Sequence, residues 1–578
     1  MDIFVHFKSV IVKIISDMGH AHIDFTRINT EPPRDKTHGD IATNAAMVLC
    51  KTLGMNPREL ATQIADKLKD NTDVDDVNVA GPGFINIKVA NAFWANRFAE
   101  LVADKESFGR PKKHNKKLIV EFTSANPTGP IHIGHVRGTV FGDSLASLLE
   151  WSGHDVFREY YVNDAGSQVV TLARSAFLRY REYLGDDIGE IPKGYYPGDY
   201  LKPVGKDIAQ IHGDKLKNMD EKEWLPVVKE IVMKSMMEMI KADLALLDVK
   251  FDNYFSEREL HDDGAIEKTL ADMRERGLIY EGVLPPPKGQ LPDDYEEREQ
   301  TLFRATDWGD DIDRPLVKSD GSYTYFAADI AYHRNKYLRG FNDQIDVLGA
   351  DHGGYVKRLK AIVRAVSNDE AELDVKICQI VKLLKDGEVQ TMSKRSGNFI
   401  TLNELHAAVG KDPIRFMMLY RKNEAPIDFD YDKVTEKSRD NPVFYVQYAH
   451  ARVYSIMRQA KEAFNGFDVA TYDFTKSDLN LLQDESEINL MKHLLNWPKV
   501  AATAAEFHEP HRISFYLYDL AALFHSLWNK GKEKPQLRFI VDNNEDLTLA
   551  RLAMVRSVAY IVKAGLDILG VDAPHEMR

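Results

Sequence analysis

Two histidines separated by two residues, His132 and His135, enclose Gly134 in a segment whose residue types suit phosphate binding. Prolines and glycines precede them and a helical apolar pattern follows, so the histidines lie at a predicted helix start. The first turn of a helix offers unpaired N–H groups and partial positive charge, and side chains three residues apart share one face. The glycine lets a ligand approach the backbone. The spacing predicts a site for nucleotide phosphates; two ordinary surface histidines are the alternative.

A second polar segment, residues 387–397, is bounded by glycines and carries the adjacent cations Lys394 and Arg395. Loops of this kind can close over a substrate. A cation brought to the β- and γ-phosphates of ATP neutralises the charge that grows as pyrophosphate leaves. A solvated charge pair is the alternative when the segment is considered alone. Its presence in the same chain as the histidine pair favours the phosphate interpretation.

The elements around the histidines have the order expected of a parallel α/β sheet. A buried strand is predicted at 118–122, followed by the turn-rich segment 124–130, the helix that starts at the histidines, and a second strand at 156–162. Further strands are predicted at 322–326 and 344–348, each followed by a helix. Ligands of such sheets bind where strands end and helices begin.

The chain as a whole is predicted to be a multidomain α/β plus all-α protein, because 578 residues are too many for one core. Residues 1–112 mix helical and strand-like patterns and form a small α/β N-terminal domain. Residues 113–440 form a Rossmann-like parallel-sheet domain with a mainly helical insertion at about 165–291. Residues 441–578 are helical and form a C-terminal α-helical bundle.

Composition and charge narrow the class of protein. Charged residues interrupt the apolar stretches well before the length of about 18 residues that a membrane span requires. The two cysteines, Cys50 and Cys378, are too few for a disulfide framework or a cysteine-rich zinc site, so we expect a reducing cytoplasm and no structural zinc. The net charge of −14 argues against non-specific coating of nucleic acid. A specific RNA can still meet the basic stretch 530–538, for which a solvated charged face is the alternative.

Residues 132–135 and 391–395 resemble the HIGH and KMSK signatures of class I aminoacyl-tRNA synthetases. The second departs from the family pattern at Thr391, where a lysine is usual, and keeps Lys394, so a modest effect on ATP handling is expected. Other segments are similar to the arginyl enzymes of this class, and they spread the resemblance over nearly the whole chain: 39–44, 120–130, 319–333 and 569–574. The resemblance implies ATP-dependent activation of L-arginine and its transfer to the 3′-terminal ribose of tRNA(Arg), with release of AMP and pyrophosphate.

The resemblance also implies roles for single residues. The expected catalytic residues are His132, His135 and Lys394. ATP is expected to act with Mg²⁺, and no metal ligands are expected from the protein. Asp351 has an alternative role as the cap of the following helix. The expected contacts to ATP are Gly134, Gly349, Asp351, His352, Met392, Ser393 and Arg395.

The arginine pocket that the resemblance implies has a chemistry that suits its substrate. A guanidinium is a planar fork of five donors, so it needs oxygens set to accept paired hydrogen bonds, an array that a lysine ammonium does not fill. A separate editing site should therefore be unnecessary. For Glu121 and Asp329 an internal salt bridge is the alternative. The expected pocket residues are Glu121, Ser124, Asn126, Tyr325 and Asp329.

The C-terminal helices resemble the anticodon-binding domain of the same family, and the N-terminal domain would by analogy touch the tRNA elbow. Most aromatic residues on such helices are core, so packing is the alternative for the expected base contacts Tyr445, Tyr448, Arg452 and Trp528. A monomer is expected. Two other functions stay open. One is a nucleotidylyltransferase, which shares the histidine motif but is usually far shorter; the other is a catalytically inactive tRNA-binding relative.

Overall fold

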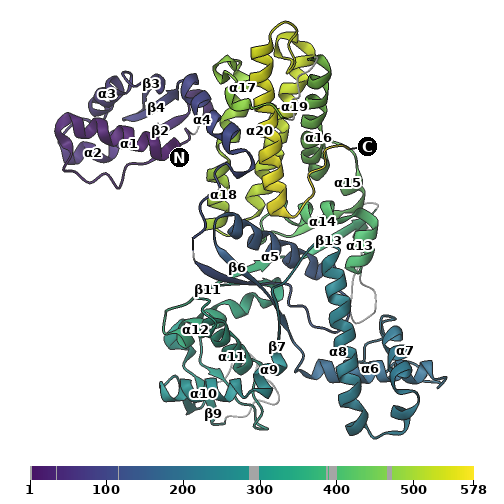
Figure 1. Ribbon diagram of the computed structural model, residues 1–578. Coiled ribbons are helices and arrows are strands. Elements are labelled where there is room, and N and C mark those ends of the chain that lie inside the picture. Colours follow the sequence, from purple (N-terminus) through teal and green to yellow (C-terminus); the bar gives the residue numbers. More distant parts are fainter. Residues whose placement is uncertain are drawn as a thin grey trace.

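The computed structural model describes residues 3–33, 35–114, 116–284, 298–385, 388–389, 400–464 and 471–577. Figure 1 shows a small N-terminal part, a central sheet from which helices project, and an upright bundle of C-terminal helices. The predicted class, multidomain α/β plus all-α with a parallel sheet, is confirmed. Within these residues no helix is long and apolar enough to cross a membrane.

The N-terminal part is a small antiparallel sheet with helices packed on it. Its elements are α1 (Ile3–Ile15), β1 (Thr30–Glu31), β2 (Ile41–Thr43), α2 (Ala45–Leu53), α3 (Pro57–Leu68), β3 (Val74–Ala80), β4 (Phe84–Val89) and α4 (Asn91–Asp104). The described strands pair in the order β1-β2-β4-β3. Helix α3 begins at Pro57 because the Asn56 side chain accepts from the first free N–H groups, those of Arg58 and Glu59.

The central sheet is entirely parallel in the part of the chain that the structure describes. Its strands and covering helices are β5 (Lys117–Glu121), α5 (Ile133–Trp151), β6 (Asp155–Val162), β7 (Asn253–Ser256), α11 (Tyr325–Leu338), β11 (Asp343–Gly349), α12 (Val356–Ser367) and β12 (Glu372–Cys378). The strand order is β12-β11-β5-β6-β7, so all carboxyl ends lie at one edge. The strands predicted at 118–122, 156–162 and 344–348 are confirmed as β5, β6 and β11.

The strand predicted at 322–326 is wrong. Tyr323 makes only an isolated β-bridge, and α11 already begins at Tyr325. Tyrosine and threonine favour a strand locally, but the helix buries residues 326–328 in a core shared with α12, and this packing decides the outcome. The sequence also gives no signal for β7, because its four residues are too few to show an alternation.

Between β6 and β7 the chain leaves the sheet and forms helices with a core of their own, α6 (Ser167–Tyr183), α7 (Leu201–His212) and α8 (Glu221–Ala245). Phe177 stacks on Trp224 in this core at a centroid distance of 3.8 Å. Figure 1 shows these helices projecting beyond the sheet. After β7 follow α9 (Glu257–Asp262), α10 (Ala265–Glu275) and a small antiparallel sheet of β8 (Ile279–Gly282), β9 (Gln300–Phe303) and β10 (Arg314–Pro315).

Short elements connect the central sheet to the bundle: β13 (Val381–Lys385), β14 (Glu388–Val389), α13 (Leu402–Val409), α14 (Lys411–Met418), β15 (Ile427–Asp430) and α15 (Tyr431–Thr435). The bundle contains α16 (Pro442–Ala463), α17 (Glu485–Leu495), α18 (Trp497–Glu506), α19 (His511–Glu533) and α20 (Glu545–Leu569). Helix α16 begins where the Asn441 side chain accepts from the Phe444 N–H. The C-terminal helical bundle of the predicted fold class is confirmed.

Arg415 of α14 ties the sheet helix α5 to the end of the bundle. Its buried guanidinium donates to the Asp143 carboxylate at 2.6 Å, the Leu569 carbonyl at 2.7 Å and the Leu247 carbonyl at 2.7 Å. A Cβ atom at Gly570 would lie 2.3 Å from this guanidinium, so the glycine gives it room. Three separate parts of the chain therefore meet at one buried cation.

Arg415→Met is expected to lower the midpoint of thermal unfolding clearly, because among the described residues Asp143 would keep only Arg158, at 3.6 Å, as an ionic partner. Removing one member of a buried ion pair costs about 3–5 kcal/mol. Calorimetry of wild type and variant measures the change. Lys563→Met, which breaks an exposed pair with Asp567, is the control and should change little. Equal midpoints for wild type and Arg415→Met would show that the ion pair does not hold these parts together.

Candidate active site

The loop after β5 delivers His132 and His135 to the first turn of α5. His132 is the N-cap residue, and its Nδ1 accepts from the Gly134 N–H at 3.1 Å. The His132 N–H donates to Nδ1 of His135 at 3.5 Å, which completes a capping box, and the two rings stack with centroids 3.9 Å apart. A Cβ atom at Gly134 would lie 2.9 Å from the His132 ring, so a larger residue there would displace that ring. The predicted motif is one compact structure at a helix start.

The segment that begins at Ile400 lies against this helix start. The Leu402 N–H donates to the Ile131 carbonyl at 2.8 Å, and the Ile133 N–H donates to the Ile400 carbonyl at 3.3 Å. His132 and Thr401 face each other in an antiparallel bridge. The chain directly after residues 390–399 is therefore fixed beside the histidines. The predicted Met392, Ser393, Lys394 and Arg395, with Thr391, lie outside the described residues.

Gly349, Asp351 and His352 lie at the carboxyl end of β11, at the same sheet edge. Gly349 is the last residue of the strand and precedes a short 3-10 helix, Ala350–Tyr355. The side chains of Asp351 and His352 are exposed and lie 3.6 Å apart. Asp351 does not cap α12, because Tyr355 is the N-cap residue of that helix and its side chain makes no capping bond. The capping alternative for Asp351 is therefore wrong.

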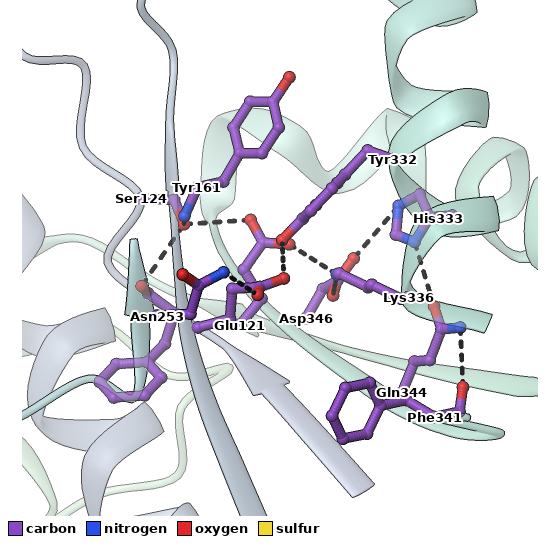
Figure 2. Close-up of polar contacts among 12 residues, drawn as sticks. Glu121, Ser124, Tyr161, Asn253, Tyr332, His333, Lys336, Phe341, Gln344 and Asp346 are labelled. Carbon is purple, nitrogen blue, oxygen red and sulfur yellow. Dashed lines mark hydrogen bonds and ion pairs between the residues drawn. The ribbon is translucent and has the colours of Figure 1, made fainter. Parts of the chain in front are cut away.

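The turn after β5 has a strained backbone at Thr123 and Ser124. Thr123 and Ser124 both have positive φ, 67° and 34°, a conformation that costs energy in residues with a Cβ atom. The Ser124 hydroxyl donates to Glu121 Oε1 at 3.0 Å and accepts from the Tyr161 N–H at 3.0 Å, as Figure 2 shows. Thr123 Oγ1 donates to Thr139 Oγ1 at 2.9 Å, which ties the turn to α5 one turn beyond His135.

Glu121 also forms the internal salt bridge that the sequence left open as an alternative. Its Oε2 accepts from Lys336 Nζ at 2.7 Å, and the same ammonium donates to Asp346 Oδ1 at 2.8 Å. Figure 2 shows the lysine reaching from α11 to the two carboxylates. Lys336 was not predicted as part of the site, because lysines are mostly exposed and this one, seven positions after Asp329, would be expected at the surface.

Asp329 is the predicted pocket residue whose charge is least compensated. No described residue forms a hydrogen bond or ion pair with its carboxylate. Burial and the neighbouring carboxylates of Glu257, Glu121 and Asp346 raise the pKa of Asp329 to about 7, against the opposing charge of Arg358. Carboxyls with raised pKa values that lie close together are typical of functional sites.

Glu257 is a second carboxyl near Asp329 with a raised pKa, and the sequence did not reveal it. It is 4% exposed at the start of α9, directly after β7. Burial and the nearby Asp164 raise its pKa to about 7. Asp164 itself accepts from the Ser256 hydroxyl at 2.7 Å and the Arg258 N–H at 2.9 Å. Glu257 could have been predicted only by recognising the strand before it, β7, and the sequence pattern does not indicate that strand.

Tyr325 and Asn126 both reach the start of α6. Tyr325 is 58% exposed, and its hydroxyl would lie 3.8 Å from a Cβ atom at Gly166, the N-cap residue of α6. Asn126 Nδ2 donates to Gln168 Oε1 at 3.2 Å. Tyr325 and Asp329 are four positions apart on α11, so the two side chains share one helix face. The structure thus gathers all five predicted pocket residues around one end of the sheet.

The four residues predicted to contact bases lie together on α16 and α19. The Arg452 guanidinium is 4.4 Å from the Tyr448 ring centre and 5.4 Å from that of Trp528. Arg452 Nη1 is 2.8 Å from His525 Nδ1, and Tyr445 packs on the same histidine ring. Tyr448 is 38% exposed. The cluster is a partly open aromatic and cationic surface on the bundle.

Comparisons with known proteins match all three parts of the chain. Family models match residues 6–89 as "Arginyl tRNA synthetase N terminal domain", 97–427 as "tRNA synthetases class I (R), catalytic domain" and 446–577 as "DALR anticodon binding domain". An arginine–tRNA ligase of Sinorhizobium medicae is 56% identical over 586 aligned residues that cover 100% of both chains. The chain belongs to the arginyl-tRNA synthetase family.

Other members of the arginyl-tRNA synthetase family agree in sequence and fold. An arginine–tRNA ligase of Rhizobium rhizogenes is 57% identical and covers 96% of both chains. The structure of the Thermus thermophilus arginyl-tRNA synthetase covers 100% of both chains with a TM-score of 0.71 at 20% identity, and so supports the fold. These matches along the full length leave no support for a nucleotidylyltransferase. The catalytic-domain match includes His132, His135, Glu121 and Asp329.

Proposed function

We propose that the chain activates L-arginine with ATP and transfers it to the 3′-terminal ribose of tRNA(Arg). An arginine carboxylate oxygen attacks the α-phosphorus of ATP, the bond to the bridging oxygen breaks, and pyrophosphate leaves. A ribose hydroxyl then attacks the carbonyl carbon of the arginyl-adenylate, the ester forms, and AMP leaves. The cluster of carboxyls around Asp329 carries this proposal, in a chain 56% identical to an arginine–tRNA ligase. Thr123 ties the turn beside this cluster to the helix that starts at the histidines.

The first turn of α5 is proposed to receive the phosphates of ATP. His132 and His135 would donate to the phosphate oxygens from one helix face, and Gly134 leaves the backbone open to them. Gly349, Asp351 and His352, at the same sheet edge, are proposed to contact the nucleoside. The exposed Asp351 carboxylate could accept from ribose hydroxyls.

Lys394 is proposed to act on the same phosphates, together with Met392, Ser393 and Arg395. The support is the attachment of Ile400 to Ile133, since six residues of chain span at most about 20 Å. Mg²⁺ is proposed to arrive with ATP. In the described ranges no group of three or more His, Cys, Asp or Glu side chains is arranged to hold a metal ion.

The arginine side chain is proposed to point toward Asp329. The Asp329 carboxylate lacks a partner among the described residues and can accept two parallel hydrogen bonds from a guanidinium. Tyr325, on the same face of α11, would cover the substrate, and Glu121, Ser124 and Asn126 would line the opposite wall. An uncharged or shorter side chain would leave the buried carboxyls without a cation, so it should be rejected.

The affinity for arginine is expected to increase as the pH rises from about 5.5 to about 7.5, and binding is expected to release protons. Asp329 and Glu257 each have a pKa raised to about 7, so the free protein still holds these protons at low pH, whereas a bound guanidinium favours the ionised carboxyls. Affinity is therefore still rising at pH 7, where each carboxyl is about half ionised, and below pH 7 it is lost by about tenfold per unit for each proton released.

Titration calorimetry at both pH values, in two buffers with different ionisation enthalpies, measures the affinity and the protons released. Asp329→Asn is the matched control and should release fewer protons. Equal affinity at both pH values, without proton release, would contradict a charge-based arginine pocket.

The tRNA is proposed to contact the aromatic and cationic cluster of Tyr445, Tyr448, Arg452 and Trp528 with its anticodon arm, and residues 1–112 with its elbow. The partly open stacking of Arg452 on Tyr448 supports base contact. We also propose a cytoplasmic monomer, with domain borders near residues 112 and 440. The insertion expected at about 165–291 is proposed to end before β7, because that strand belongs to the central sheet. Light scattering after size exclusion, with and without tRNA, tests the monomer.

ATP–pyrophosphate exchange tests the first step of the proposed function. Arginine-dependent exchange is expected, and tRNA is commonly needed for this step in the family. Exchange should therefore be measured with and without tRNA(Arg). Exchange that does not depend on arginine under either condition would contradict the proposal.

A further inference from the structure

Lys336 carries a buried positive charge between two acidic residues of the pocket. Its side chain is fully buried, and its ammonium lies 2.7 Å from Glu121 Oε2, 2.8 Å from Asp346 Oδ1 and 4.4 Å from the Tyr332 ring centre. Burial opposes its charge, but the two carboxylates raise the pKa of Lys336 above its ordinary value. The lysine is therefore charged, and Glu121 and Asp346 share one cation.

Two basic residues close to Lys336 in the chain, His333 of α11 and Arg339 directly after this helix, do not replace this cation. His333 Nδ1 lies 3.2 Å from Gln344 Oε1, and the Gln344 amide donates to the Phe341 carbonyl at 3.1 Å, so His333 must donate from Nδ1. Burial lowers the pKa of His333 to about 3, which leaves the ring neutral. Figure 2 shows this chain of contacts behind Asp346. Arg339 bonds Glu159 through both Nη atoms at 2.6 Å.

The Lys336 contact continues to the turn that lines the pocket. Glu121 uses Oε2 for the lysine and Oε1 for the Ser124 hydroxyl, and Ser124 Oγ accepts from the Tyr161 N–H. One ammonium thus sets the direction of the carboxylate, and the carboxylate sets the direction of the hydroxyl at a residue with positive φ. Without the cation, Glu121 and Asp346 would repel each other and Asp329.

We infer that Lys336 is a positioning residue for the amino-acid substrate, because it fixes Glu121 and Ser124 and neutralises part of the acidic cluster. Asp329, whose carboxyl has no hydrogen-bond or ion-pair partner among the described residues, is then the carboxyl left for the incoming guanidinium. This inference rests on the proposed function. It assigns Lys336 no contact with arginine, ATP or tRNA; the lysine acts through Glu121.

The experiment compares arginine KM and ATP KM in aminoacylation for Lys336→Met, for Lys336→Arg and for the double variant Lys336→Met with Asp346→Asn. The double variant keeps the net charge of residues 336, 121 and 346 at −1, since it removes one positive and one negative charge. It therefore avoids two uncompensated buried carboxylates and keeps the test independent of gross misfolding.

Lys336→Met and the double variant both lack the cation, and both are expected to raise arginine KM by about tenfold to a hundredfold. This is the size expected when charged hydrogen bonding around one carboxylate is lost. ATP KM should stay within about threefold of wild type. Lys336→Arg should bring arginine KM back to within about fivefold of wild type. Lys411→Met is the matched control, because Lys411 also bridges two carboxylates, Asp248 at 2.7 Å and Asp572 at 2.9 Å, far from the pocket in sequence. It should leave both KM values unchanged.

Equal changes of the two KM values, or a double variant with the wild-type arginine KM, would reduce Lys336 to a purely structural role. Failure of the inference is distinct from failure of the proposed function. If wild-type protein charges tRNA with arginine and the KM values do not separate, only the inference fails. If wild-type protein does not charge tRNA with arginine, the proposed function fails first.

Discussion

Asp329→Asn is expected to raise arginine KM by about a hundredfold or more and to leave ATP KM within about threefold. The asparagine keeps the shape of the side chain but offers one acceptor and a like-directed donor where a guanidinium needs two acceptors. Truncating one member of a desolvated charge pair costs several kcal/mol, and each 1.4 kcal/mol is about a factor of ten. Steady-state aminoacylation with each substrate varied in turn measures both constants.

The stability of Asp329→Asn separates a binding role from a scaffold role. The raised pKa of Asp329 means that its ionised form is disfavoured in the folded protein, so its contribution to stability falls as the pH rises above the ordinary range near 4 toward 7. Removing the charge should therefore not lower the unfolding midpoint at about pH 8. Asp343→Asn, at the opposite end of β11, is the control for arginine KM. Equal changes in arginine KM and ATP KM would return Asp329 to a structural role.

Replacing the two histidines is expected to slow activation by about a hundredfold to a thousandfold each, the usual effect of removing one donor to a charge that develops in the transition state. His132→Asn and His135→Gln are the sharpest variants. Asparagine is a good N-cap residue and glutamine suits the third helical position, so both keep the capping box of α5 and lose only the imidazoles. Single-turnover adenylate formation at saturating arginine measures the rate.

His154→Asn is the matched control for these variants, because His154 also packs against a second histidine, His114, at 4.2 Å. It should leave the rate unchanged. Arginine KM should change little in His132→Asn and His135→Gln, the reverse of the pattern for Asp329→Asn. Wild-type rates in both histidine variants would show that the pair serves only to start the helix.

The local parts of the site could be predicted from the sequence, because they depend on residues close together in the chain. The two histidines, the glycine between them and the helix that follows form one capping box, whose signals lie within residues 132–135. The strand before it and the strand after the helix also show their patterns clearly. The resemblance supplied the pocket residues, and the structure brings them to one end of the sheet.

The parts that could not be predicted depend on contacts between distant residues. Lys336 lies 215 positions from Glu121, and nothing in its own surroundings distinguishes it from a surface lysine. Glu257 follows a strand too short to recognise. The segment 322–326 has the composition of a strand, although packing starts a helix at Tyr325. In each case the outcome depends on tertiary packing or on charges from other elements.

Charging of tRNA(Arg) by the wild-type protein, with ATP and each of the twenty amino acids in separate reactions, tests the central claim most directly. Acid-precipitable aminoacyl ester is expected with arginine alone, with one AMP released for each ester formed. Charging with a different amino acid, or binding of arginine and tRNA without any ester in the presence of ATP, would contradict the proposed function.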